Sequence, residues 1–224
     1  MIQNNEGKLI VFEGISGSGK STLISELLRR DKLKDSIVTN WFSLEKFRKI
    51  ASEIGKHEDM NNKLYSLIYA LEFYARYEFC IEPNYKNGKS VIAHRYIYSG
   101  ISHDIVRGTN MKYLQFLYKD CIDPTIVVFM NIKPQESYKR IISYRKPSFF
   151  ECGLDIEYNS DLYLGLTRFK QNYFSNKELE ERFLDFQQKV YETYMSILPG
   201  NKTIFIDSSK PINELNEIVY KSLV

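Results

Sequence analysis

One short segment constrains this chain more than any other. Residues 14–21 read GISGSGKS, with glycine at the first and sixth positions, lysine at the seventh and serine at the eighth. The preceding residues 8–13, KLIVFE, form the apolar run expected of a strand that is buried on both faces, and a helical pattern follows over 19–30. A strand, a glycine-rich turn and a helix in this order predict a phosphate-binding loop in an α/β domain.

Each residue type in this loop has a chemical role. Glycines let the backbone curl so that its N–H groups point at phosphate oxygens, and the helix that follows adds the positive end of its dipole. We expect Lys20 to reach the β- and γ-phosphates of ATP and the Ser21 hydroxyl to bind Mg²⁺. The predicted ATP-binding residues are Gly14, Ile15, Ser16, Gly17, Ser18, Gly19, Lys20, Ser21 and Thr22.

The loop alone indicates only a nucleoside triphosphate, because switches and motors carry it too. A GTPase should also have an Asn-Lys-x-Asp motif. Asn62, Asn176 and Asn201 each begin an Asn-Lys pair, but none has aspartate at the fourth position. A motor ATPase usually ends another strand with a magnesium-holding aspartate, whereas the apolar run at 125–130 leads into Asn131. These differences favour a small kinase.

Composition excludes several other classes. The 224 residues are 43% hydrophobic and 26% charged, which is ordinary for a globular protein, and the net charge of +3 is too weak to indicate a nucleic-acid polymer as partner. No apolar run approaches the ~18 residues of a membrane helix, so we expect no membrane partner. The three cysteines are scattered and form no metal-binding pair, so we expect free thiols and a cytoplasmic location.

Strand-like and helix-like segments alternate along the chain. Expected strands are 8–13, 36–39, 90–93, 125–130 and 202–206. Expected helices are 19–30, 44–56, 61–80, one or two over 97–119 with a break near Gly108, 134–144, one capped by Ser175 and Glu178, and one opened by Ser209 and Pro211. Pro83 and Asn87-Gly88 are expected to interrupt the chain after the third helix.

This alternation predicts a three-layer fold, in which a five-stranded parallel sheet has helices on both faces. No linker divides the chain, so we expect one domain over 1–224. Residues 146–175 are rich in aromatics and have no clear period, which indicates a mobile insertion with one helix. We interpret this insertion as a lid.

The motifs together resemble thymidylate kinases and the related deoxynucleoside kinases over nearly the whole chain. The segment IVFEGISGSGKST matches the family's opening strand and loop, and VIAHRYIYSGIS places Arg95, Tyr96 and Ser99 in step with its next motif. PTIVVFMNIKPQESYKRI and TIFIDSSKPINEL are similar to the strands and helices that end the family's domain. The resemblance implies a P-loop kinase that moves the γ-phosphate of MgATP to a nucleotide or nucleoside, and it implies a homodimer formed through helices such as 61–80.

The resemblance also implies roles for individual residues. Lys20 and Arg95 would stabilise the charge of the transferred phosphoryl group, and Arg140, Arg145 and Lys146 would close over the phosphates. Glu13 would lie near the acceptor, as a base toward a nucleoside or in a positional or magnesium role toward a monophosphate. The predicted acceptor-binding residues are Phe73, Arg76, Arg95, Tyr96 and Ser99.

The chain departs from the family at four places. Ser16 replaces an aspartate of the loop, and His94 replaces the acid before Arg95. The loop Asn40-Trp41-Phe42 lacks the usual phosphate-binding arginine, and His103-Asp104 replaces a nucleoside-reading Tyr-Gln pair. Three of these changes lie on the acceptor side.

We therefore predict a thymidylate-kinase-like phosphotransferase with a dTMP-like nucleoside monophosphate as acceptor. Two alternatives stay open on the sequence. One is a deoxynucleoside kinase that uses Glu13 as base, and the other is a non-catalytic, ATP-binding regulatory protein, which the change to His94 would permit.

Overall fold

A computed structural model describes residues 6–41, 62–157 and 174–223. The five strands are β1 (Leu9–Glu13), β2 (Ile37–Asn40), β3 (Val91–His94), β4 (Ile126–Asn131) and β5 (Thr203–Asp207). They form one sheet in the order β2-β3-β1-β4-β5, and every neighbouring pair is parallel. All five predicted strands are confirmed to within one residue at each end.

Strand β1 shows why its sequence is apolar throughout. Successive side chains of a strand point to opposite faces of the sheet. Leu9 and Val11 belong to the core on one face, Ile10 and Phe12 belong to the core on the other, and all four are fully buried. The central strand therefore has no face in contact with water.

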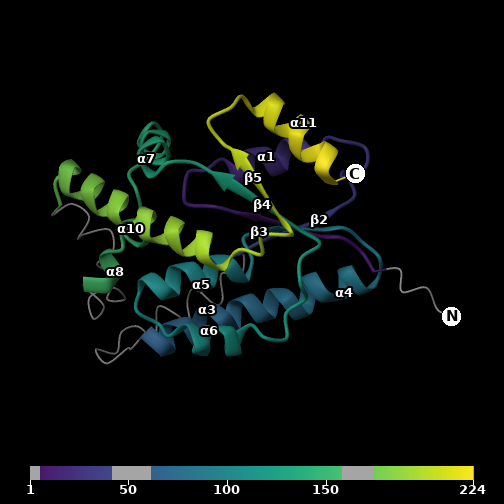
Figure 1. The fold of residues 1–224 in the computed structure, drawn as a ribbon, viewed down its shortest axis with the longest axis horizontal. Helices are drawn as coiled ribbons and strands as arrows, with labels where there is room; N and C mark the ends of the chain where they lie inside the picture. The colour runs from purple at the N-terminus through teal and green to yellow at the C-terminus, as the bar shows by residue number, and fades with distance from the viewer. Residues whose placement is uncertain (1–5, 42–61, 158–173, 224) are drawn as a thin grey trace.

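Helices cover both faces of the sheet (Figure 1). On one face lie α1 (Lys20–Leu27) and α11 (Ile212–Leu223), which contact each other. The other face carries α3 (Asn62–Arg76), α5 (Ile97–Val106), α6 (Met111–Leu117) and α10 (Asn176–Ile197). The predicted three-layer α/β architecture is confirmed.

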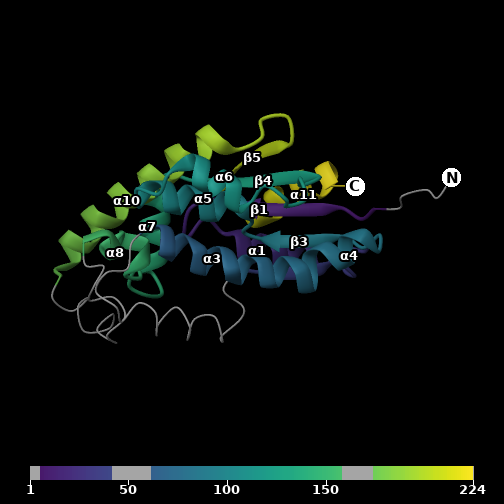
Figure 2. The same cartoon turned by 90° about the horizontal axis from the view of Figure 1, so that it is seen from below.

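The third predicted helix is longer than its sequence suggested. Helix α3 continues through a π-helical turn, Tyr77–Ile81, into α4 (Glu82–Lys86), and the three segments form one rod in Figure 2. Pro83 lies in the first turn of α4 and does not end the rod. A proline inside a helix removes one backbone hydrogen bond and crowds the preceding turn, and at Pro83 that preceding turn is the π-helical one, where the hydrogen-bond pattern already changes. The rod ends before Asn87-Gly88, as predicted.

Most remaining helix boundaries agree with the sequence. Gly108, with φ 87°, separates α5 from α6. Helix α7 (Pro134–Ile142) begins at Pro134, and α10 begins with a complete capping box between Ser175 and Glu178. The predicted helix at 44–56 lies outside the described residues.

The predicted insertion at 146–175 is described only in part. Its first half forms a 3₁₀ turn, Phe150–Cys152, and α8 (Leu154–Glu157), while residues 158–173 lie outside the described residues. Phe149, Cys152 and Leu154 are buried in a third core with side chains of α3, α7 and α10. This half is therefore anchored to the domain, and the lid and the single domain over 1–224 stay predictions.

In the described ranges no helix has the length and apolar character needed to span a bilayer.

Gly153 allows a test of this third core. Its φ is +63°, and a Cβ there would lie 2.5 Å from Cδ2 of Phe186. Gly153→Ala should lower the free energy of unfolding by about 2–4 kcal/mol, because left-handed strain and overpacking add. Urea unfolding measures the loss. Gly200→Ala is the control, since a Cβ there meets nothing within 4 Å. Equal stability of the two variants would contradict this packing.

Candidate functional site

The glycine-rich loop connects β1 to α1 at the carboxyl edge of the sheet. Its glycines adopt φ values of 138° at Gly14, 71° at Gly17 and 92° at Gly19, which L side chains rarely adopt. Space is also restricted, because a Cβ at Gly14 would lie 2.8 Å from the carbonyl oxygen of Met130. The loop is therefore built for glycine by both conformation and close approach.

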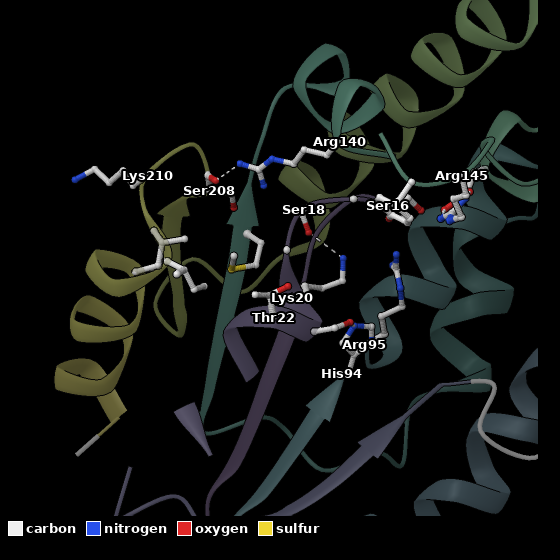
Figure 3. A pocket seen from close by; sticks show the side chains of 18 residues that line it. Ser16, Ser18, Lys20, Thr22, His94, Arg95, Arg140, Arg145, Ser208 and Lys210 are labelled. Carbon is white, nitrogen blue, oxygen red and sulfur yellow. Dashed lines mark hydrogen bonds and ion pairs between the residues drawn. The ribbon is translucent and has the colours of Figure 1, made fainter. Parts of the chain in front are cut away.

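The loop borders a cavity of about 530 Å³, drawn in Figure 3. Loop and α1 residues from Ser16 to Thr22 line one side, and α7, β4 and the turn after β5 supply much of the rest. Five cationic side chains line it, namely Lys20, Arg95, Arg140, Arg145 and Lys210, against one carboxylate, Glu151. This excess of positive charge suits a polyanion such as a nucleoside triphosphate.

Lys20 is held inside the loop. Its Nζ donates hydrogen bonds to the carbonyl oxygens of Gly14 and Ile15 and to Oγ of Ser18, each at 2.9 Å. Burial lowers the pKa of Lys20 well below its usual value, and nearby Arg95 lowers it further, while Glu13 opposes the shift. A phosphate oxygen would offer the ammonium group a full negative charge in place of these neutral acceptors.

Glu13 joins three distant parts of the chain at the end of β1. Its Oε1 accepts from the backbone N–H of Tyr96 at 2.8 Å and of Ser99 at 3.2 Å. Its Oε2 accepts from the Ser99 hydroxyl at 2.6 Å and from the Tyr194 hydroxyl at 3.0 Å. Burial raises the pKa of Glu13, and Arg95 and these hydrogen bonds oppose the increase.

Arg95 is the one residue other than glycine with positive φ, 70°, among those that the structure describes. Its Nη1 donates to Ser99 Oγ at 2.9 Å and to the Tyr194 hydroxyl at 3.3 Å. Strained backbone of this kind persists where the surroundings fix it, and it concentrates at functional sites. The Glu13 network provides that fixation, and Figure 3 shows Arg95 pointing into the cavity.

Two further arginines border the cavity from the opposite side. Arg140, on α7, donates from Nη2 to the carbonyl oxygen of Ser208 at 2.5 Å. Arg145 makes a two-pronged ion pair with Glu151, with both N···O distances 2.7 Å. Both predicted residues thus reach the cavity, and Arg145 would have to exchange Glu151 for phosphate to act on a ligand.

The predicted magnesium ligand, Ser21, also lines the cavity. Its Oγ lies 3.1 Å from Nε2 of His94, at the end of β3. Burial, together with the charges of Lys20 and Arg95, lowers the pKa of His94 to about 3. No group of three or more His, Cys, Asp or Glu side chains that could hold a metal occurs in the described part of the chain. An ion here would therefore need oxygen ligands from a bound nucleotide or water.

The predicted acceptor residues lie behind Arg95. Phe73 and Tyr96 are fully buried, and the Tyr96 hydroxyl donates to the carbonyl oxygen of Ile122 at 2.9 Å. The Arg76 guanidinium lies over the rings of Trp41 and Phe73, 5.5 and 5.3 Å from their centroids. These rings belong to the core, so their contact with an acceptor stays a prediction.

Arg76 is 3% exposed and incompletely paired. Its Nη2 donates to the carbonyl oxygen of Arg95 at 3.1 Å, but Nε and Nη1 have no hydrogen-bond partner among the described residues. Burial lowers the pKa of Arg76 to about 10, and Glu72 and Glu13 oppose the shift. Buried donors without acceptors are costly, and an anionic ligand would satisfy them.

The predicted ATP-binding residues divide into two groups. Ser16, Gly17, Ser18, Gly19, Lys20, Ser21 and Thr22 line the cavity. Gly14 and Ile15 do not line it, and Ile15 is fully buried in the core. Their carbonyl oxygens accept hydrogen bonds from Lys20, so these two residues position the lysine without lining the cavity.

The structure also reveals site residues that the sequence did not. Tyr194 and Gln187 reach the site from α10, and Gln187 Oε1 accepts from the backbone N–H of Ser16 at 3.2 Å. Ser208 and Lys210 line the cavity from the turn after β5. On α10 the apolar period alone marks Tyr194 as a core position, so no local pattern could have identified it.

Known proteins match the chain over almost its full length. The family model for thymidylate kinase matches residues 12–219. A probable thymidylate kinase 2 of Saccharolobus solfataricus is 32% identical over 222 residues, which cover 97% of this chain and 95% of that protein. A thymidylate kinase of a Geobacillus strain is 26% identical, and the match covers 94% of this chain and 92% of that protein.

A thymidylate kinase of Ligilactobacillus salivarius is 24% identical over 226 residues, covering 94% of each protein. The matched segment includes the end of β1, the phosphate loop, the Glu13 network and most of α11. The resemblance found in the sequence is thus confirmed. The chain belongs to the thymidylate kinase family.

Proposed function

We propose that this protein transfers the γ-phosphate of ATP to dTMP. The observation that carries the proposal is the complete phosphate loop opening onto a cavity lined by five cations, in a chain of this family. The relatives are named thymidylate kinases or probable thymidylate kinases, which supports dTMP as acceptor.

In this proposal the loop N–H groups and Lys20 bind the phosphates of ATP. Phosphoryl transfer needs fixed positive charge where negative charge spreads over the moving group. Hydrogen bonds to Ser99 and Tyr194 hold Arg95 in place, so its charge is positioned before the phosphate arrives. Lys20 would exchange its loop acceptors for phosphate oxygens. Arg140 and Arg145 lie across the cavity and would add charge from the other side.

The residues fit a divalent cation that accompanies ATP. The Ser21 hydroxyl lies on the cavity wall and supplies an oxygen donor, and the nucleotide would supply further oxygens. Such an ion neutralises phosphate charge when bound. Mg²⁺ is the ion expected for the family. Glu13 would not bind it directly, because both of its oxygens already accept hydrogen bonds from the protein.

The geometry of Glu13 favours a positional role over the base role of the alternative nucleoside kinase. A general base must come within hydrogen-bond reach of the hydroxyl that it deprotonates. Glu13 is fully buried, does not line the cavity, and accepts four hydrogen bonds. We propose that it holds Arg95 in place.

The cytoplasmic location stays a prediction.

An ADP-release assay against a panel of nucleoside monophosphates and nucleosides tests the proposed reaction. dTMP should give the highest kcat/KM, and Lys20→Ala should lower kcat about 10²–10³-fold by removing a fixed transition-state charge. Lys34→Ala is the control, since exposed Lys34 pairs with Asp31 and does not line the cavity, and it should retain most activity. A nucleoside as best acceptor, or ADP release indifferent to every acceptor, would contradict the proposal.

Arg76 is proposed to bind the acceptor phosphate, because it is buried with donors that no described group satisfies. Arg76→Lys keeps the charge but loses the two-pronged match to phosphate. The KM for dTMP should rise by about tenfold or more while the KM for ATP stays nearly constant. Steady-state kinetics measure both constants.

Arg30→Lys is the control for this variant, since Arg30 follows α1 and pairs with Asn216 of α11, on the opposite face of the sheet from Arg76. Melting temperatures of both variants check that folding is retained. An unchanged dTMP KM in folded Arg76→Lys would place the acceptor phosphate elsewhere.

We also propose a homodimer formed through α3. Leu64, Leu67 and Leu71 lie along one stripe of this helix and are 37%, 45% and 53% exposed, and Phe79 beyond them is 83% exposed. Apolar residues grouped in this way mark an interaction surface. A second copy of the chain would cover the stripe.

The double variant Leu67→Glu, Leu71→Glu should raise the dimer dissociation constant by at least about 100-fold, because two charges would be buried. Sedimentation velocity measures it. Ile218→Glu, on α11 and 38% exposed, is the control and should stay dimeric. A monomeric unmodified protein at tens of micromolar would refute the dimer.

A further inference from the structure

Ser21 and His94 are brought together by the register of the sheet. Phe12 of β1 pairs with His94, so the end of β3 lies beside the start of α1. Both residues line the cavity, and Ser21 Oγ is 3.1 Å from His94 Nε2. Figure 3 shows His94 beneath Lys20 and Arg95, at the floor of the cavity.

Ser21 Oγ and His94 Nε2 are hydrogen-bonded to each other, so an oxygen and a nitrogen donor atom lie side by side at the cavity wall. In the tautomer with its proton on Nδ1, the imidazole presents the Nε2 lone pair toward the same space as the Ser21 hydroxyl. A cation held by both atoms would take the place of the hydrogen bond between them.

The donor chemistry of this pair differs from an all-oxygen site. Mg²⁺ prefers oxygen ligands, while imidazole nitrogen favours ions further along the first transition series. Neighbouring carboxylates do not restore an oxygen site: the oxygens of Glu13 are saturated, and Arg145 holds both oxygens of Glu151. Mn²⁺ accepts both kinds of donor and has the octahedral preference that phosphate binding needs.

We propose that Ser21 and His94 together ligate the divalent cation of the bound nucleotide, and that this mixed oxygen–nitrogen pair makes the protein prefer Mn²⁺ over Mg²⁺. The inference rests on the proposed binding of ATP. It assigns to His94 a direct contact with the cation and to this chain a metal preference of its own.

Pulsed EPR of uniformly ¹⁵N-labelled protein with Mn²⁺ and an unlabelled, non-hydrolysable ATP analogue tests the contact. A directly bound imidazole gives a ¹⁵N coupling, while nitrogen of the nucleotide is ¹⁴N and gives a different signal. The coupling should be present in the unmodified protein and absent in His94→Asp. Its absence from the unmodified protein would overturn the proposal.

Calorimetric titration of the same analogue in Mn²⁺ and in Mg²⁺ tests the preference. The ratio of the two affinities should be at least about tenfold higher in the unmodified protein than in His94→Asp, where a carboxylate restores an oxygen donor. Equal ratios would overturn the inference and leave the proposed function standing. Failure of the analogue to bind with either ion would overturn both. The EPR result on the unmodified protein decides the case if His94→Asp does not fold.

Discussion

Glu13 is a carboxylate with no exposed surface, placed at the end of the central strand, and the site is assembled around it. Removing a charge from water is expensive, and it is tolerated where hydrogen bonds and an opposite charge compensate. Four donors from the β3–α5 junction and from α10 compensate here, and Arg95 adds its charge. Because Ser99 and Tyr194 also accept hydrogen bonds from Arg95, the guanidinium that faces the cavity is tied to a carboxylate that does not line it.

In the phosphate loop, too, groups of the protein itself satisfy a buried charge. Without a ligand, Lys20 satisfies its three donors on the loop itself, which keeps the loop closed around its own lysine. Arg145 is likewise held by Glu151 across the cavity. Binding a polyanion exchanges these internal partners for phosphate oxygens. The free energy of binding is therefore the difference between two sets of contacts, and mutations in either set change it.

The departures from the family pattern are close to one another in the fold. Trp41, from the changed loop after β2, lies over Arg76, and its ring centroid is 5.2 Å from that of Phe73. His103 interacts through Nδ1 with the carbonyl oxygen of Ser99 at 2.7 Å, next to the Glu13 network. His94 contacts Ser21. Changes at scattered positions of the sequence thus gather around Arg76, the Glu13 network and Ser21.

The elements with a local signal are those that could be predicted without the structure. Lys8–Glu13, the glycine loop and the capping box at Ser175 each carry their information within a few residues, so the strands, the loop and the start of α10 could be predicted. Lys20 and Ser21 were predictable for the same reason. Only the tertiary structure decided that Tyr194 and Gln187 serve the site, that Phe73 is core, and that His94 meets Ser21. These contacts join residues 73 or more positions apart or depend on the packing of whole helices, and no short sequence pattern encodes which side chains such packing brings within hydrogen-bond distance.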